Sequence, residues 1–210
     1  MDVRAQPVPA AIRTGICAEW LTVVWMTLEA AVGIGAGVAA GSIALVAFGL
    51  DSVIELVSGA TVLWRLRLQA DAAAEAPGIE RAERLASRTV GLGLVALAAY
   101  VVAQSAYDLW TRAAAKPSAA GVALAVAALL VMPPLARTKR RIAAAIDSPA
   151  LRGDAACGTV CAYMAATLLA GLVARAAFGW WWADPVAALG IVYFIVREAR
   201  EALAGDADGC

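Results

Sequence analysis

Residues 41–64 have the sequence GSIALVAFGLDSVIELVSGATVLW, an apolar stretch that contains two carboxylates, Asp51 and Glu55. Its length is close to the roughly 20 residues that an α-helix needs to cross the hydrocarbon core of a bilayer. Side chains four residues apart on a helix lie on one face, about one turn from each other. The stretch therefore predicts a membrane-spanning helix with two acids on the same face.

The composition of the whole chain points to the bilayer as its solvent. Of the 210 residues, 62% are hydrophobic, and the 17 basic and 17 acidic side chains cancel. A balanced charge gives no support for a nucleic-acid partner. Histidine is absent, so a metal site or a proton relay must use carboxylates, thiols, hydroxyls or amides. We expect the lipid bilayer as a partner and no tightly bound cofactor.

The pattern of apolar segments predicts an all-α integral membrane protein with six transmembrane helices. Residues 15–204 would form one six-helix transport domain, with a cytoplasmic tail at 1–14 and a short tail at 205–210. Fourteen Lys and Arg side chains fall on the termini and alternate connections, against three (Arg112, Lys116 and Arg175) on the other side. This bias favours both termini in the cytoplasm of a multi-pass protein of the cell (inner) membrane. The expected spans are residues 16–40, 42–64, 89–107, 118–136, 155–173 and 180–196.

Two proline-containing motifs predict local features of the helices. Pro133-Pro134 should bend or end the fourth helix, because neither residue can donate a backbone hydrogen bond. Asp184-Pro185 is typical of a cap at the start of the sixth helix.

Three acids, Glu29, Asp51 and Glu55, are expected near the centres of their spans. Removing a carboxylate from water is costly, so acids at such depth need partners and are candidates for function. Asp51 and Glu55 together could bind one divalent cation. The alternative is a pair of neutral acids that form hydrogen bonds to neighbouring helices. Glu29 is either an additional ligand, a proton carrier or a structural hydrogen-bonding group.

Cys157 and Cys161 have the same four-residue spacing on the fifth helix, and Asp154 lies one turn before them. The chain's four cysteines, including Cys17 and Cys210, are too few for a secreted disulfide scaffold, so we expect free thiols. Thiolates favour soft or borderline metals, although cysteine also packs well as a small apolar residue. At about 1.5 Å per residue, Glu55 and Cys161 would lie at nearly the same depth. Two oxygens and two sulfurs there would suit tetrahedral Zn²⁺.

The motifs that carry these residues resemble those of the cation diffusion facilitator family. Its second-helix signature is similar to Gly41-Ser42-Ile43-Ala44-Leu45 with Asp51-Ser52-Val53-Ile54-Glu55 and Ser58. Leu151-Arg152-Gly153-Asp154-Ala155 with Cys157 and Cys161 resembles the fifth-helix signature, and Trp182-Ala183-Asp184-Pro185-Val186-Ala187 resembles the opening of the sixth helix.

The resemblance implies a secondary transporter, not an enzyme, that exports a divalent transition metal such as Zn²⁺ in exchange for protons by alternating access. It assigns the metal to Asp51 and Glu55, with Cys157 and Cys161 as co-ligands and Glu29 or Asp154 as accessory groups. A homodimer is also implied. The pattern departs from the family at Glu55, which replaces the usual Asp, and at both cysteines, which replace His and Asp. The family's usual cytosolic C-terminal metal-binding domain is missing, which implies a minimal branch.

Two other functions remain compatible with these residues. One is a metal-binding or regulatory membrane protein that keeps the scaffold without transporting. The other is a membrane thiol oxidoreductase that uses Cys157 and Cys161, although three intervening residues depart from the Cys-X-X-Cys spacing of such redox pairs.

Overall fold

The chain folds into a bundle of long helices in the computed structural model, which describes residues 8–70, 76–113 and 115–204. Side chains are described for these residues except 8–9, 68–70, 76–90, 149–150, 198, 201–202 and 204. The helix α1 begins within the predicted N-terminal tail, while residues 1–7 and 205–210 of the predicted tails lie outside the described residues. The helices are α1 (Val8–Ala40), α2 (Ile43–Ala70), α3 (Ala76–Thr111), α4 (Ala119–Ile146), α5 (Pro149–Phe178) and α6 (Ala183–Ala204).

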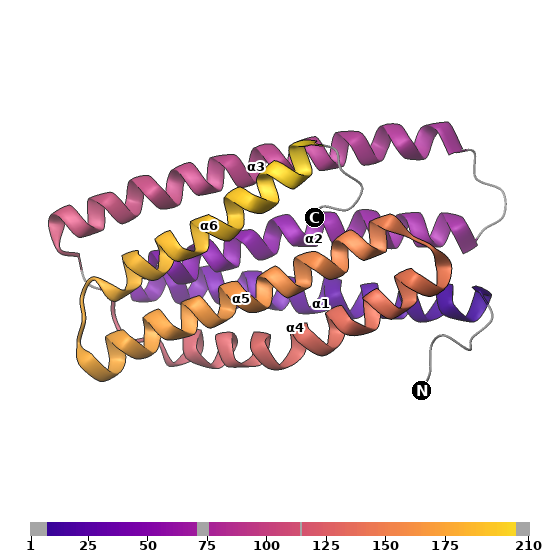
Figure 1. Ribbon diagram of the computed structural model, residues 1–210. Helices are drawn as coiled ribbons and strands as arrows, with labels where there is room; N and C mark the ends of the chain where they lie inside the picture. The colour runs from indigo at the N-terminus through magenta and orange to yellow at the C-terminus, as the bar shows by residue number, and fades with distance from the viewer. Residues whose placement is uncertain (1–7, 71–75, 114, 205–210) are drawn as a thin grey trace.

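The helices form two groups (Figure 1). In the first, α1 packs against α2 and α4, and α5 packs against α4 and α2. In the second, α3 and α6 lie side by side and join the first group through α2 and α5. The core between them is apolar and includes Met26, Leu45, Phe48, Met132 and Met164.

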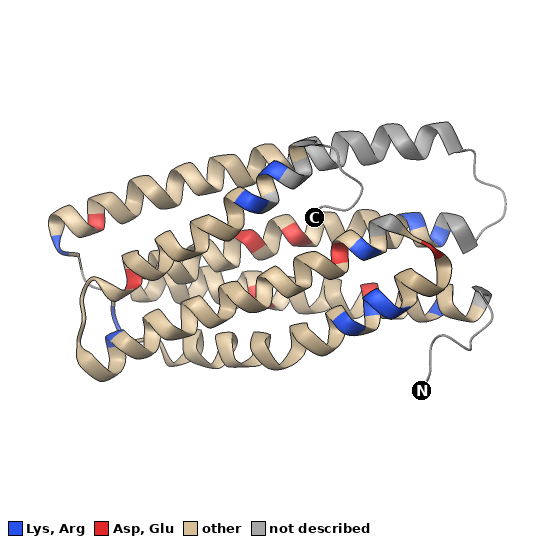
Figure 2. Cartoon of the chain, in the orientation of Figure 1, with Lys and Arg blue, Asp and Glu red and all other residues tan. Residues whose placement is uncertain are grey.

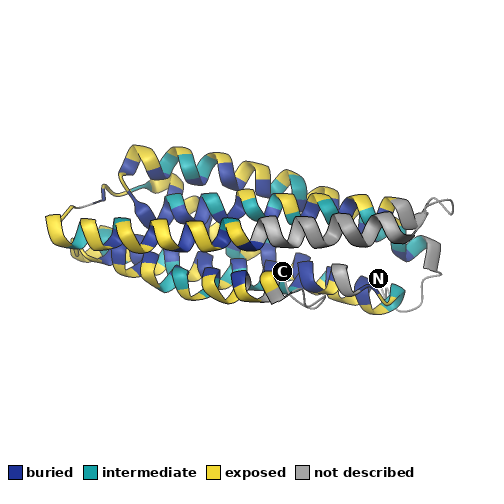
Figure 3. Cartoon of the chain, turned by 90° about the horizontal axis from the view of Figure 1, so that it is seen from above, coloured by how far each residue is buried: buried dark blue, intermediate teal, exposed yellow. Residues whose placement is uncertain are grey.

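The outer faces of the helices are apolar, as a lipid environment requires. Buried residues lie between the helices, while exposed residues follow the outside of the bundle (Figure 3). The exposed side chains include Leu28, Val38, Leu92, Leu130 and Tyr163, whereas several carboxylates are buried inside. This inversion of the pattern of soluble proteins identifies a multi-pass membrane protein.

Within the described residues, five helices are long and apolar enough to cross a bilayer, which confirms five of the six predicted spans. The sixth, on α6, stays a prediction, as does the orientation of the termini. The five segments are Ala10–Ala40, Ile43–Arg67, Gly91–Thr111, Ala119–Ile146 and Leu151–Phe178.

The turn between α1 and α2 is held by a residue of α6. Gly41 has a positive φ of 66° that allows the chain to reverse, and the Ser42 hydroxyl accepts a hydrogen bond from the Leu45 backbone N–H at 3.1 Å. Asp184 accepts hydrogen bonds from the Ser42 hydroxyl and, at 3.3 Å, from the Ala44 backbone N–H. The predicted role of Asp184 as a cap of its own helix is therefore wrong. It lies in the first turn of α6 and neutralises the N-terminus of α2, where a negative charge is favoured.

Of the two outcomes predicted for Pro133-Pro134, a bend or an end of the fourth helix, the end is wrong. α4 continues through both prolines to Ile146, so the expected connection at 137–152 shrinks to the residues around Ser148. A proline ring fixes φ near the helical value, so the helix can continue through it. The few backbone hydrogen bonds that the prolines remove are offset by the packing of α4 before and after them. This continuation carries Lys139 into the bundle, where it is 3% exposed.

The helices α1 and α2 approach each other most closely at a pair of glycines. A Cβ at Gly33 would lie 2.9 Å from the Gly49 Cα, and one at Gly49 would lie 2.6 Å from the Ile34 backbone nitrogen. Both neighbours are backbone atoms and cannot move aside alone. The contact brings the C-terminal part of α1 against the N-terminal part of α2, just before the acidic face of α2.

We expect Gly49→Val to force α1 and α2 apart and to destabilise the protein by about 1–3 kcal/mol, the usual range for overpacking. Thermal unfolding of the purified protein in detergent measures the effect. Gly35→Ala is the matched control, because a Cβ at Gly35 meets nothing within 4 Å. Equal midpoints for the two variants would contradict the close approach.

Candidate functional site

Acidic side chains from α1 and α2 meet a thiol of α5 near the middle of the bundle. We call Glu29, Asp51, Glu55 and Cys161 the inner cluster. The Cys161 thiol donates to Glu29 Oε1 at 3.4 Å, and the Ser52 hydroxyl donates to the same oxygen at 2.9 Å. Asp51 lies within electrostatic range of Glu29, and Cys161 lies within range of all three acids. The packing of α1, α2 and α5 thus brings three of the four predicted core ligands and Glu29 together.

Asp51 is the member of the inner cluster with the clearest capacity for a ligand. The residue is 1% exposed, and its Oδ1 atom is buried without a hydrogen-bond donor among the described residues. A buried acceptor without a donor is unfavourable unless a proton or a cation occupies it. The carboxylate can therefore hold either one.

A second group of charges lies nearer to the end of the bundle where α4 meets α5. We call Glu19 of α1, Lys139 of α4 and Asp154 of α5 the outer cluster. The Lys139 ammonium donates to Glu19 Oε2 at 3.1 Å and forms a closer ion pair with Asp154. All three side chains are buried. Asp154, predicted as an accessory ligand, is thus paired with a lysine in this structure.

Sequence reasoning missed Lys139, because the expected end of the fourth span at residue 136 placed it in a cytoplasmic connection. The signal was present in the spacing of the apolar residues. The buried face of α4 recurs every three or four residues and continues through the lysine without a break: Leu124, Ala125, Ala128, Met132, Leu135, Ala136, Lys139, Ile142 and Ala143. A helical stripe of this kind places a charged residue inside the bundle wherever it falls on the stripe.

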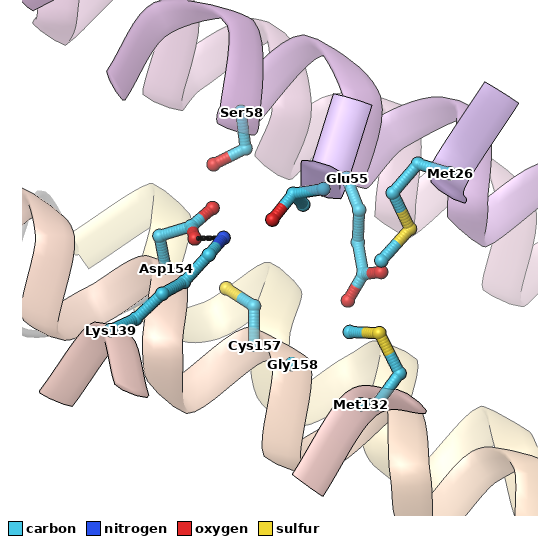
Figure 4. Close-up of a pocket in the computed structure, with 9 residues that line it drawn as sticks. Met26, Glu55, Ser58, Met132, Lys139, Asp154, Cys157 and Gly158 are labelled. Carbon is cyan, nitrogen blue, oxygen red and sulfur yellow. Dashed lines mark hydrogen bonds and ion pairs between the residues drawn. The ribbon is translucent and has the colours of Figure 1, made fainter. Parts of the chain in front are cut away.

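One pocket joins the two clusters (Figure 4). It lies between α1, α2, α4 and α5, with Glu55 on one wall and Lys139 and Asp154 on another. Its complete lining is Thr22, Met26, Glu55, Ser58, Met132, Lys139, Asp154, Cys157 and Gly158. The pocket therefore places Glu55 of the inner cluster and the Lys139–Asp154 pair of the outer cluster on the walls of one cavity.

The cysteines differ in their chemical state. Cys17 and Cys161 are free, and Cys17 is exposed while Cys161 is buried. Cys157 is disulfide-bonded, so the prediction of a free thiol there is wrong, and Cys210 lies outside the described residues. A disulfide sulfur is not a thiolate, and Cys157 cannot act as a thiolate ligand while the bond is intact.

The described residues contain no group of three or more acidic or cysteine side chains placed to hold a metal ion. The side chains of the inner cluster are consequently near one another, but they do not surround one common position for an ion. Metal binding would need the carboxylates to move closer together. Figure 2 shows acidic residues on several helices along the bundle, and many of the basic residues toward the end of the bundle where α1 begins and α4 meets α5.

Comparison with known proteins identifies the scaffold. The cation efflux transmembrane domain matches residues 20–205. The chain belongs to the cation efflux family. Its members are transporters rather than enzymes, and the resemblance inferred from the second, fifth and sixth helices is confirmed. The chain is also 29% identical over 166 residues to the uncharacterized transporter sll1263 of Synechocystis sp., an alignment that covers 78% of this chain and 53% of that protein. The chain therefore spans about half the length of this relative.

We expect Lys139→Met to destabilise the protein by about 3–5 kcal/mol, because it leaves two buried carboxylates without their cation. The triple variant Glu19→Gln, Lys139→Met and Asp154→Asn should regain most of that stability, since no charge stays buried. Thermal unfolding in detergent compares the two. A triple variant less stable than Lys139→Met alone would show that the charges do not compensate one another.

Proposed function

We propose that this protein exports a divalent transition metal, with Zn²⁺ as the expected cargo, from the cytoplasm by proton antiport with alternating access. The observation that carries the proposal is the inner cluster, in which buried acids of α1 and α2 meet the Cys161 thiol inside a cation efflux scaffold. A homodimer in the inner membrane, with both termini cytoplasmic, completes the proposal.

The donor atoms of the inner cluster support the choice of metal. Asp51 and Glu55 would supply two carboxylate oxygens, and Cys161 would supply one sulfur. Oxygen and sulfur together suit Zn²⁺, which accepts both, better than Mg²⁺ or Ca²⁺, which prefer oxygen alone. Cys157 would become a fourth donor only after reduction of its disulfide. With the Cys157 disulfide intact, Glu29 would be the fourth donor to the metal, because its Oε1 already accepts a hydrogen bond from Cys161.

The same atoms support proton coupling. A carboxylate or thiol has to lose its proton before it binds metal, so metal and protons compete for one set of oxygens and sulfurs. Glu29 would accept the proton that Cys161 releases, because the thiol donates to that carboxylate. Protons arriving from the other side of the membrane would then displace the metal.

We expect Asp51→Asn to reduce zinc uptake into proteoliposomes at least tenfold, and Cys161→Ser to reduce it less, because serine keeps an oxygen donor. Cys17→Ser is the matched control, since Cys17 is a free but exposed thiol on α1. Stopped-flow fluorescence of a trapped zinc indicator measures the rate. Uptake that persists in Asp51→Asn would remove the inner cluster from the transport path.

We further expect the rate of zinc uptake to depend on an imposed pH gradient. Zinc that enters the lumen should be exchanged for protons that leave it, so the lumen pH should rise during uptake. A trapped pH indicator measures proton flux beside the zinc signal. Abolishing the gradient with an ionophore should lower the zinc rate. A zinc rate that is the same with and without the gradient would exclude obligatory proton antiport.

The absence of a closed donor set among the described residues favours one second candidate, a membrane protein that binds metal without moving it. Zinc binding at equilibrium in detergent, without flux in proteoliposomes for zinc or other divalent metals, would identify that function.

A further inference from the structure

The outer cluster is built like an occupied cation site. The Lys139 ammonium lies between Glu19 of α1 and Asp154 of α5, and its two ion pairs join three helices. Beside them, a Cβ at Gly59 of α2 would lie 3.7 Å from Glu19 Oε2 and 3.9 Å from Asp154 Oδ1. The two carboxylates therefore face α2 at a point where no side chain intervenes.

The cluster has more negative than positive groups. Two buried carboxylates share one ammonium, and Glu19 Oε1 is buried with no hydrogen-bond donor among the described residues. A cluster that served only to hold helices together would be balanced by one acid and one lysine, since a surplus buried charge is costly. The oxygen without a donor can therefore accept a proton, or a cation of higher charge than the ammonium.

The cluster also lies on a route to the transport site. Lys139 and Asp154 line the same pocket as Glu55, and Figure 4 shows the Lys139–Asp154 pair facing into it. A cation released from Asp154 would meet Glu55 across this pocket. Two acid pairs, one from Glu19 and Asp154 and one from Asp51 and Glu55, thus stand in series along the bundle.

We propose that Glu19 and Asp154 form a second site for a divalent cation, that the Lys139 ammonium occupies it as a built-in counter-ion, and that a metal ion displaces the ammonium on its way to the inner cluster. The exchange forms no covalent bond. The ammonium withdraws toward the arginine-rich end of α4, where a long side chain can reach water, and the metal takes its place between the carboxylates. Only the passage to the inner cluster rests on the proposed function; the site itself does not.

The composition of the chain allows a direct test on the unaltered protein. Lys116 and Lys139 are its only lysines, and Lys116 is exposed while Lys139 is buried. A water-soluble amine-reactive ester should label Lys116 readily and Lys139 slowly. Saturating Zn²⁺ should raise the labelling of Lys139 at least fivefold and leave Lys116 unchanged, as measured by mass spectrometry of peptides from protein in detergent.

Two variants separate displacement at the outer cluster from a change caused by metal at the inner cluster. The zinc-dependent labelling of Lys139 should persist in Asp51→Asn and should disappear in Glu19→Gln. Its loss in Asp51→Asn would overturn the proposal, because Lys139 would then respond only to the transport site. Equal labelling of Lys139 with and without Zn²⁺ in the unaltered protein would overturn it too. None of these readouts needs flux, so failure of transport and failure of this site are distinguishable.

A binding measurement gives independent support. We expect Asp51→Asn combined with Lys139→Gln to bind one equivalent of Zn²⁺ per chain by titration calorimetry, at least tenfold more tightly than Asp51→Asn alone. Adding Glu19→Gln should abolish that gain. A folded double variant whose zinc affinity matches that of Asp51→Asn alone would overturn the proposal. If the double variant does not fold, the labelling of the unaltered protein decides.

Discussion

Every carboxylate that α1, α2 and α5 carry into the bundle has to be compensated there, because lipid surrounds the helices and offers no water to solvate a charge. The outer and inner clusters solve this problem differently. In the outer cluster a lysine neutralises Glu19 and Asp154 through direct ion pairs. In the inner cluster Glu29 receives only a hydroxyl and a thiol, and Asp51 keeps an oxygen without a donor. The outer cluster is thus partly neutralised by the protein, whereas in the inner cluster Asp51 Oδ1 has no hydrogen-bond donor among the described residues.

The rest of the fold follows from bringing these acids to the same depth. The contact between Gly33 and Gly49 lets α1 approach α2 so that Glu29 reaches Ser52. On the N-terminal side of this contact, Asp184 of α6 neutralises the N-terminus of α2 and fixes the second group of helices to the first. The small residues and the cap therefore serve one purpose, which is to hold α2 and its two acids against α1.

Hydropathy was enough to predict five confirmed spans, and the four-residue spacing was enough to predict that Asp51 and Glu55 are on one face of α2. Their role as metal ligands stays a prediction. Hydropathy and spacing failed where a tertiary contact decided the outcome. Asp184 satisfies a partner 140 residues away, which no local capping rule can reveal. Lys139 was misplaced because the fourth span was expected to end at residue 136, before the charged residues that follow it. The chemical state of Cys157 depends on which thiol reaches it, which spacing along one helix does not determine.

The two clusters differ in the kind of counter-ion that their carboxylates have. The Lys139 ammonium can move away from Glu19 and Asp154, but it stays attached to α4. Any ion that displaces it therefore competes with the same ammonium for the two carboxylates. Asp51 and Glu29 have no lysine or arginine among their described contacts. Under the proposed function, an ion held there would be released only when another ion or a proton replaces it. Electrostatic interactions are strong where water is excluded. Under the two proposals, the returning ammonium of the outer cluster and the exchangeable ion of the inner cluster would therefore make binding at each cluster depend on which ion occupies the other.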